Sequence, residues 1–170
     1  MAGTPSFDYQ RIIDKYYPEG TRLRDIYMRH GRSVAALALE ISSRKQLPLS
    51  PEQIEAAAMV HDIGIFLCDA PGIHCHGSEP YIDHGPLGAA LLRHEGAPEW
   101  AARVAERHTG VGIGDLVPET MLEKLICYAD KFYSKSGSME RKPLERVEAS
   151  IARFGADNLA RFHALHSLFA

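Results

Sequence analysis

The sequence predicts an all-α fold, a bundle of about six or seven helices, and three observations favour it. Apolar residues recur at steps of three and four along most of the chain, as on the buried stripe of a helix. No alternating run of apolar and polar residues is long enough to indicate a convincing strand. The links between helical segments are short, and the 170 residues, 45% hydrophobic, fit a single domain over residues 1–170.

The first helical segments are marked by residues that begin and end helices. These segments are residues 7–17, 22–46 and 50–66. Pro18 ends the first, because proline cannot continue a helix. The inward stripe of the second carries His30 among its apolar residues. Ser50 as N-cap and Pro51 at the first helical position begin the third.

The second half of the chain is expected to be helical after one long loop. Residues 67–82 contain two prolines and two glycines, which favour a loop. The helical segments that follow are residues 83–96, 97–110, 118–137, 142–155 and 156–169. Gly96 and Gly110 end the first two of these, Pro118 begins the next, and the last two are amphipathic.

Composition and charge exclude several classes of protein. The net charge is −3 with no long basic tract, so the sequence does not indicate a nucleic-acid partner. The three cysteines, Cys68, Cys75 and Cys127, do not form a disulfide framework and suit a reducing, cytoplasmic setting. The sequence shows no signal peptide and no run of about 20 apolar residues, so a membrane is not expected either. The oligomeric state is left open.

Histidines and carboxylates recur on the inward faces of successive helical segments. A lone histidine on such a face is usually a packing residue, but here several converge on one core. The series is His30, His61, Asp62, His84, His108 and Asp130. Burial of an unpaired carboxylate is costly, and a divalent cation would offset that cost. Imidazoles and carboxylates that converge in a bundle core therefore indicate a metal site.

This series resembles the HD-domain superfamily of metal-dependent phosphohydrolases, whose central motif is present as HDIG at residues 61–64. The resemblance covers residues 20–135 or so, and the two extra histidines resemble the two-metal branch. It implies a first metal held by His30, His61, Asp62 and Asp130. It implies a second metal held by His84, His108 and a bridging Asp62. Two divalent ions are expected, with iron or manganese favoured and other divalent ions possible.

The residue after HDIG departs from the pattern of many two-metal relatives. They carry a lysine there that contacts substrate phosphate, whereas this chain has Ile65. Another cation must then meet the phosphate, and Arg107 and Lys131, each adjoining a ligand in sequence, are the preferred pair for catalysis and substrate binding. Lys135, a helical turn further on, is expected to matter less, and Arg29 is a further candidate.

The loop at residues 67–82 joins two ligand-bearing segments, so it is expected to pass near the mouth of the site. Substrate contact by His74, His76 or Glu79 is one interpretation, and a plain surface loop is the other. A structural zinc site here is disfavoured, since the spacing of its cysteines and histidines matches no standard zinc module.

The expected function is hydrolysis of a phosphate ester, in a nucleotide or another small phosphorylated metabolite, by metal-activated water. The same ligand series also occurs in HD-fold di-iron oxygenases, which oxidise a C–H bond with O₂. Histidine and carboxylate ligands suit both, so the ligands alone do not separate the two chemistries. A non-catalytic module with the same fold is a third reading, and the intact ligand set disfavours it.

Overall fold

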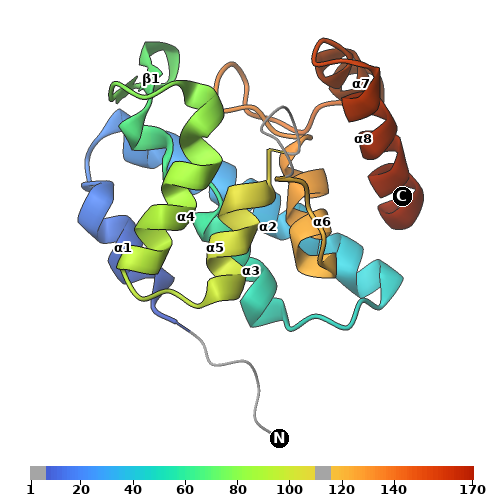
Figure 1. The fold of residues 1–170 in the computed structure, drawn as a ribbon, viewed down its shortest axis with the longest axis horizontal. Helices are drawn as coiled ribbons and strands as arrows, with labels where there is room; N and C mark the ends of the chain where they lie inside the picture. The colour runs from blue at the N-terminus through green and yellow to red at the C-terminus, as the bar shows by residue number, and fades with distance from the viewer. Residues whose placement is uncertain (1–6, 110–115) are drawn as a thin grey trace, which may run out of the picture.

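The structure is a computed structural model that describes residues 7–109 and 116–170, and its all-α class confirms the prediction (Figure 1). The described residues form eight α-helices, one for each helical segment of the sequence and therefore more than the expected six or seven. The helices are α1 (Tyr9–Tyr16), α2 (Arg22–Lys45), α3 (Pro51–Val60), α4 (His84–His94), α5 (Glu99–Arg107), α6 (Met121–Asp130), α7 (Leu144–Ala152) and α8 (Ala156–Phe169).

The loop between α3 and α4 is more ordered than its proline and glycine content suggests. Two short antiparallel strands, β1 (Asp69–Ala70) and β2 (Cys75–His76), pair within it. Three 3₁₀ turns accompany them, η1 (Ile65–Leu67), η2 (Pro71–Ile73) and η3 (Tyr81–Asp83). The last turn leads directly into α4, so the loop fixes where that helix begins.

Two predicted helices end earlier than the sequence pattern indicated. The segment at residues 50–66 is helical only to Val60, and His61 is its C-cap. The chain then turns, and the buried hydroxyl of Tyr17 donates a hydrogen bond of 2.7 Å to the carbonyl oxygen of Ile63. The segment at residues 118–137 is helical only to Asp130. Both early ends fall at a predicted metal ligand, so tertiary contacts override helix periodicity at the site.

The helices pack as two groups around α2 and α3, and their apolar cores meet beside His30. In Figure 1, α1, α4 and α5 lie on one side and α7 and α8 on the other. α4 packs on α5, α2 packs on α3 and α6, and α7 and α8 pack together. His30 lies on α2 between Met28, in one apolar core, and Val34, in the other. No helix of the described ranges is long and apolar enough to cross a bilayer.

Candidate metal centre

Six side chains from α2 to α6 meet in one buried cluster at the centre of the fold. They are His30, His61, Asp62, His84, His108 and Asp130. His61 and His108 directly follow α3 and α5, while His84 begins α4 and Asp130 ends α6. All but Asp130 are at most 5% exposed. Most residues of the cluster thus lie at helix ends, so side chains from several helices can meet at one point.

The first group consists of the four residues predicted for the first metal. Their ligand atoms all lie within 4.8 Å of one another. The Nε2 atom of His30 lies 2.8 Å from Oδ1 of Asp130 and 3.2 Å from Oδ2 of Asp62. The Nε2 atom of His61 lies 3.1 and 3.2 Å from the same two oxygens. Two imidazoles and two carboxylates therefore face a common centre.

The second group shares Asp62 with the first but uses its other oxygen. Oδ1 of Asp62 lies 3.3 Å from Nε2 of His84 and 3.1 Å from Nε2 of His108. The early end of α3 makes this possible, because Asp62 lies in a turn rather than on a helix face beside His61. A carboxylate with one oxygen toward each group could hold a cation on either side, as the predicted bridging role of Asp62 requires.

The orientation of three imidazoles indicates that the cluster binds cations. The Nδ1 atoms of His61, His84 and His108 each lie at hydrogen-bonding distance from a backbone carbonyl. The carbonyls belong to Ala58, Tyr81 and Ala105, at 2.5, 2.5 and 2.8 Å respectively. A carbonyl can only accept, so Nδ1 carries a proton, and Nε2 of each neutral ring has the lone pair that a cation would bind. This is the usual second contact of a metal-binding histidine.

Two features of the cluster fit bound cations. The Nε2 atoms of His84 and His108 lie 3.0 Å apart, although both present lone pairs. Neither oxygen of the buried Asp62 has a hydrogen bond of acceptable geometry among the described residues, despite the nitrogens around it. A divalent ion in each group would accept lone pairs from these histidine nitrogens and carboxylate oxygens. Nitrogen and oxygen ligands suit iron, manganese or cobalt. The residues present therefore fit the two expected ions.

The two groups differ in their electrostatics. At His61, burial opposes the charged form, but the Asp62 and Asp130 carboxylates outweigh it and raise the pKa to about 10. At His108, burial dominates and lowers the pKa to about 4. The first group contains two carboxylates and the second contains only Asp62, so the first is the more negative and a cation is expected to bind there more tightly.

Two glycines allow the elements of the cluster to approach each other closely. A Cβ atom at Gly64 would lie 2.6 Å from the amide nitrogen of Gly88, on α4. A Cβ atom at Gly85 would lie 2.9 Å from the carbonyl oxygen of Ala105, the same oxygen that faces Nδ1 of His108. Both distances are too short for a side chain, so these glycines set the position of α4 against α3 and α5.

Two lysines lie against the cluster. The Nζ atom of Lys135 is 3.0 Å from Oδ2 of Asp62, and Asp62 raises its pKa against the opposing effect of burial. The Nζ atom of Lys131 is 3.3 Å from Oδ2 of Asp130 and donates a 2.8 Å hydrogen bond to the carbonyl of His108. The ranking of Lys135 below Lys131 is therefore not supported by geometry, since both ammonium groups reach the cluster.

The structure does not bring Arg107 into the cluster. Its guanidinium donates a 2.9 Å hydrogen bond to the carbonyl of Val117 and lies 2.8 Å from a carboxylate oxygen of Glu119. These described contacts lie on the approach to α6, so the predicted contact of Arg107 with substrate phosphate lacks geometric support. Its role in catalysis and substrate binding stays a prediction.

The loop residues proposed for substrate contact also lie away from the cluster. His74, His76 and Glu79 are exposed, His74 after η2 and His76 on β2. None of the three lines the cavity at the cluster. The plain surface loop is therefore the reading that the geometry favours, and substrate contact by these side chains stays an untested prediction.

The cluster opens onto a cavity of about 480 Å³. Its lining includes three cluster residues, His84, His108 and Asp130, together with both lysines. The remaining lining residues are Tyr81, Ile82, Thr109, Tyr133, Lys142, Val147, Ser150, Ile151 and Phe154. A volume of this size is typical of a small-molecule site. Sequence reasoning missed Tyr81 and Lys142, although Tyr81 stands one helical turn before His84.

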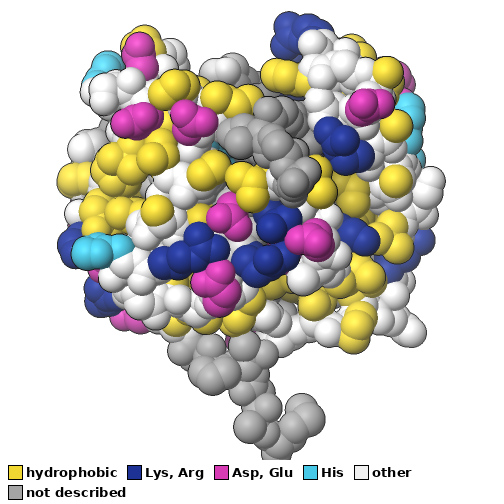
Figure 2. All heavy atoms as spheres, viewed as in Figure 1, with side chains coloured by type: hydrophobic (Ala, Val, Ile, Leu, Met, Phe, Trp, Pro, Cys, Tyr) yellow, Lys and Arg dark blue, Asp and Glu magenta, His cyan; other side chains and the backbone are white. Residues whose placement is uncertain are grey.

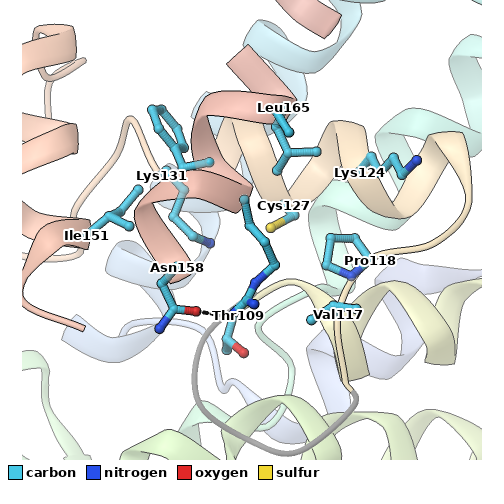
Figure 3. Close-up of a pocket in the computed structure, with 12 residues that line it drawn as sticks. Thr109, Val117, Pro118, Lys124, Cys127, Lys131, Ile151, Asn158 and Leu165 are labelled. Atoms are coloured by element: carbon cyan, nitrogen blue, oxygen red, sulfur yellow. Dashed lines mark hydrogen bonds between the residues drawn. The ribbon is translucent and has the colours of Figure 1, made fainter. Parts of the chain in front are cut away.

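A smaller apolar cavity of about 170 Å³ adjoins the first, and Figure 3 shows its lining. Thr109, Lys131 and Ile151 line both cavities. In Figure 3 the side chains of Lys131 and Cys127 point into the smaller cavity, and Leu165 closes it from α8. The aliphatic part of Lys131 therefore separates an apolar chamber from the charged cluster.

Several curated proteins are similar to this chain over part of their lengths. A tRNA (cytidine(56)-2′-O)-methyltransferase of Thermoplasma volcanium is 26% identical over 96% of this chain and 47% of its own length. The same-named protein of Picrophilus torridus is 29% identical over 71% of this chain and 35% of its own length. An uncharacterized protein of Methanocaldococcus jannaschii is 34% identical over 55% of this chain and 56% of its own length.

The chain thus spans between about a third and just over half of the lengths of these curated relatives. No solved structure shows a significant match to it. The HD domain family matches residues 27–135, which is more than half of the chain and includes all six clustered side chains. The chain is therefore a member of the HD domain family, a superfamily of metal-dependent phosphohydrolases.

Proposed function

We propose that this chain hydrolyses a phosphate ester of a small phosphorylated metabolite, nucleotides included. The observation that carries the proposal is the pair of ligand groups joined through Asp62 beside a cavity with two ammonium groups. Two divalent ions bound there would supply an activated water molecule and polarise the phosphoryl group. In the overall reaction the ester P–O bond breaks, the water oxygen joins phosphorus, and the leaving oxygen takes a proton.

The residues of the chain support this reaction through charge and position. Lys131 and Lys135 lie on the cavity side of the cluster, where their ammonium groups can bind phosphoryl oxygens. The backbone contacts of His61, His84 and His108 hold their rings in one orientation, so little reorganisation is needed when substrate binds. The apolar side chains that line the cavity can contact the organic part of the ester.

The names of two relatives offer a second candidate, methyl transfer to tRNA. The chain spans less than half of both relatives, so their shared name does not assign methyl transfer to the part that this chain matches. Di-iron oxygenation is the third candidate, because the ligand types suit it equally. Two lysines at the cluster fit an anionic phosphate ester, which favours hydrolysis over oxidation of an uncharged substrate.

The test is a panel assay with purified protein and added Mn²⁺ or Fe²⁺. Phosphate release is measured from nucleotides and phosphomonoesters, with oxygen uptake and methyl transfer to tRNA measured in parallel. The proposal expects metal-dependent phosphate release that is lost in Asp62→Ala. Oxygen uptake or methyl transfer without phosphate release would overturn it.

A further inference from the structure

A second hollow lies outside the main cavity and is rich in positive charge. It has a volume of about 400 Å³ and is lined by Ser134, Lys142, Arg146, Ala149, Ser150 and Arg153. Lys142 and Ser150 also line the main cavity, so the two spaces adjoin each other. Half of the described lining residues are cations and none is acidic.

These three cations lack partners in the part of the chain that the structure describes. The side chains of Lys142, Arg146 and Arg153 make no hydrogen bond or ion pair there. The pKa of Lys142 is lowered, first by burial and then by the charges of Lys131 and Arg146, despite the opposing effect of Asp130. Positive charge held together without a counter-charge favours an external anion.

The main cavity, which adjoins the outer hollow, has exposed apolar side chains in its lining. Ile82 and Phe154, which are 41% and 55% exposed, both line the main cavity. They are two of the three large hydrophobic residues that are exposed in the described ranges. Large apolar side chains exposed beside a cavity commonly mark a ligand surface. The main cavity thus offers cations at the cluster and exposed apolar side chains, and it shares Lys142 with the outer hollow.

We propose that the outer hollow is a second anion subsite, so that the substrate is an organic bisphosphate. One phosphate lies at the metal cluster with Lys131 and Lys135. The organic part lies against Ile82 and Phe154, and the second phosphate binds the outer cations, Lys142, Arg146 and Arg153. This inference rests on the proposed function for the first phosphate, but the second subsite can be measured without turnover.

The test compares a nucleoside 3′,5′-bisphosphate with the matching 5′-monophosphate. Calorimetry measures the Kd of both ligands, and a phosphate assay measures kcat/KM for both. The wild-type chain is expected to prefer the bisphosphate about tenfold or more in each measurement. The triple variant Lys142→Ala, Arg146→Ala and Arg153→Ala is expected to lose most of that preference.

A second triple variant controls for net charge. Arg22, Arg32 and Lys45 are exposed cations of α2 that line none of these spaces and have no partner in the described ranges. Their replacement by alanine is expected to keep the preference. The single variant Arg153→Ala serves if the first triple variant does not fold. It removes only an exposed side chain and is expected to lower the preference severalfold.

The outcomes separate the two proposals. Preferential binding of the bisphosphate without phosphate release would leave the subsite standing and contradict hydrolysis. Phosphate release with equal Kd values for both ligands would keep hydrolysis and overturn the subsite. An equal loss of preference in both triple variants would also overturn it, since the effect would then be general charge.

Discussion

Two groups of cations in this chain differ in their partners. On the face formed by α4, α5 and the start of α6, arginines alternate with carboxylates, as Figure 2 shows at the centre of the view. Arg93 contacts Glu99 and Glu106, and Arg103 contacts Glu119 and Glu123. Around the cavity, by contrast, Lys142, Arg146 and Arg153 have no carboxylate partner among the described residues.

The difference teaches how to separate structural from functional charge. A cation already paired with a carboxylate joins two helices and has little affinity left for a ligand. A cation held near other cations beside a cavity keeps its affinity for an anion from solution. Lys131 and Lys135 are intermediate, because their partners are the same carboxylates that a metal would engage.

The largest effect is expected on the cavity side, from Asp62→Ala. This change removes the carboxylate shared by both ligand groups, so phosphate release should fall by at least about a thousandfold, equivalent to several kcal/mol of transition-state stabilisation. Steady-state kinetics with the best substrate of the panel measure it. Glu99→Ala, on the paired face, is the control and should stay within about twofold of wild type. Comparable losses in both variants would contradict the functional difference between the cavity side and the paired face.

Replacement of the lysines should give the next largest effect. Lys135→Ala and Lys131→Ala each remove an ammonium group beside the cluster, worth about 1.5–3 kcal/mol, so kcat/KM should fall about ten- to a hundredfold. Arg107→Ala should cost less, because the described contacts of Arg107 are with Glu106, Val117 and Glu119, outside the cluster. Metal content per chain serves as the control for intact sites. A larger loss in Arg107→Ala than in Lys135→Ala would restore the ranking that the sequence suggested.

A smaller effect, on stability, is expected from Gly64→Ala. The new methyl group would collide with the backbone of α4, and overpacking of this kind costs about 1–3 kcal/mol. For a chain of this size, that lowers Tm by about 2–4 °C per kcal/mol. Thermal unfolding followed by circular dichroism checks it. Gly72→Ala is the matched control, since nothing lies within 4 Å of a Cβ there, and an equal loss in this variant would contradict the packing account.

The smallest effect is expected on the paired face, from Glu123→Gln. Burial alone would raise the pKa of Glu123, but Arg103 and two backbone amides outweigh it and hold the pKa below the ordinary 4.5. A lowered pKa in the folded state means that the charge stabilises the fold above pH 4.5 and that this contribution is lost as the pH falls below it. The variant should therefore be about 1 kcal/mol less stable than wild type at pH 7, with a smaller difference near pH 3. Urea unfolding at both pH values measures it, and a difference that grows in acid would refute the account.

The order of ligands could be predicted from the sequence because each one adjoins a local signal. His61 and Asp62 interrupt an apolar run, and His84 follows a loop at a helix start. The all-α fold class could be predicted for the same reason, because apolar periodicity also depends only on residues that are close in sequence. The end of α3 at Val60 could not be predicted, because it depends on Tyr17 and on the approach of α4.

The cations of the cavity show the same limit more sharply. Lys142 lies twelve positions after Asp130, and nothing in its local sequence connects it with the ligands. The backbone amide of Lys142 donates a 2.9 Å hydrogen bond to the carbonyl of Phe132, which folds the intervening segment back toward the cavity. Sequence periodicity describes only residues a few positions apart. It therefore does not predict that this segment folds back to the cavity, nor that Arg107 contacts Glu119.

The most direct test of the central claim is the metal content per chain, measured by elemental analysis after reconstitution with Mn²⁺ or Fe²⁺. We expect about two ions in wild type, loss of both in Asp62→Ala, and retention of the first in His84→Ala, because His84 belongs only to the second group. His30→Ala should lose the first ion preferentially. One ion or none in wild type, or equal losses in His30→Ala and His84→Ala, would contradict two separate sites joined through Asp62.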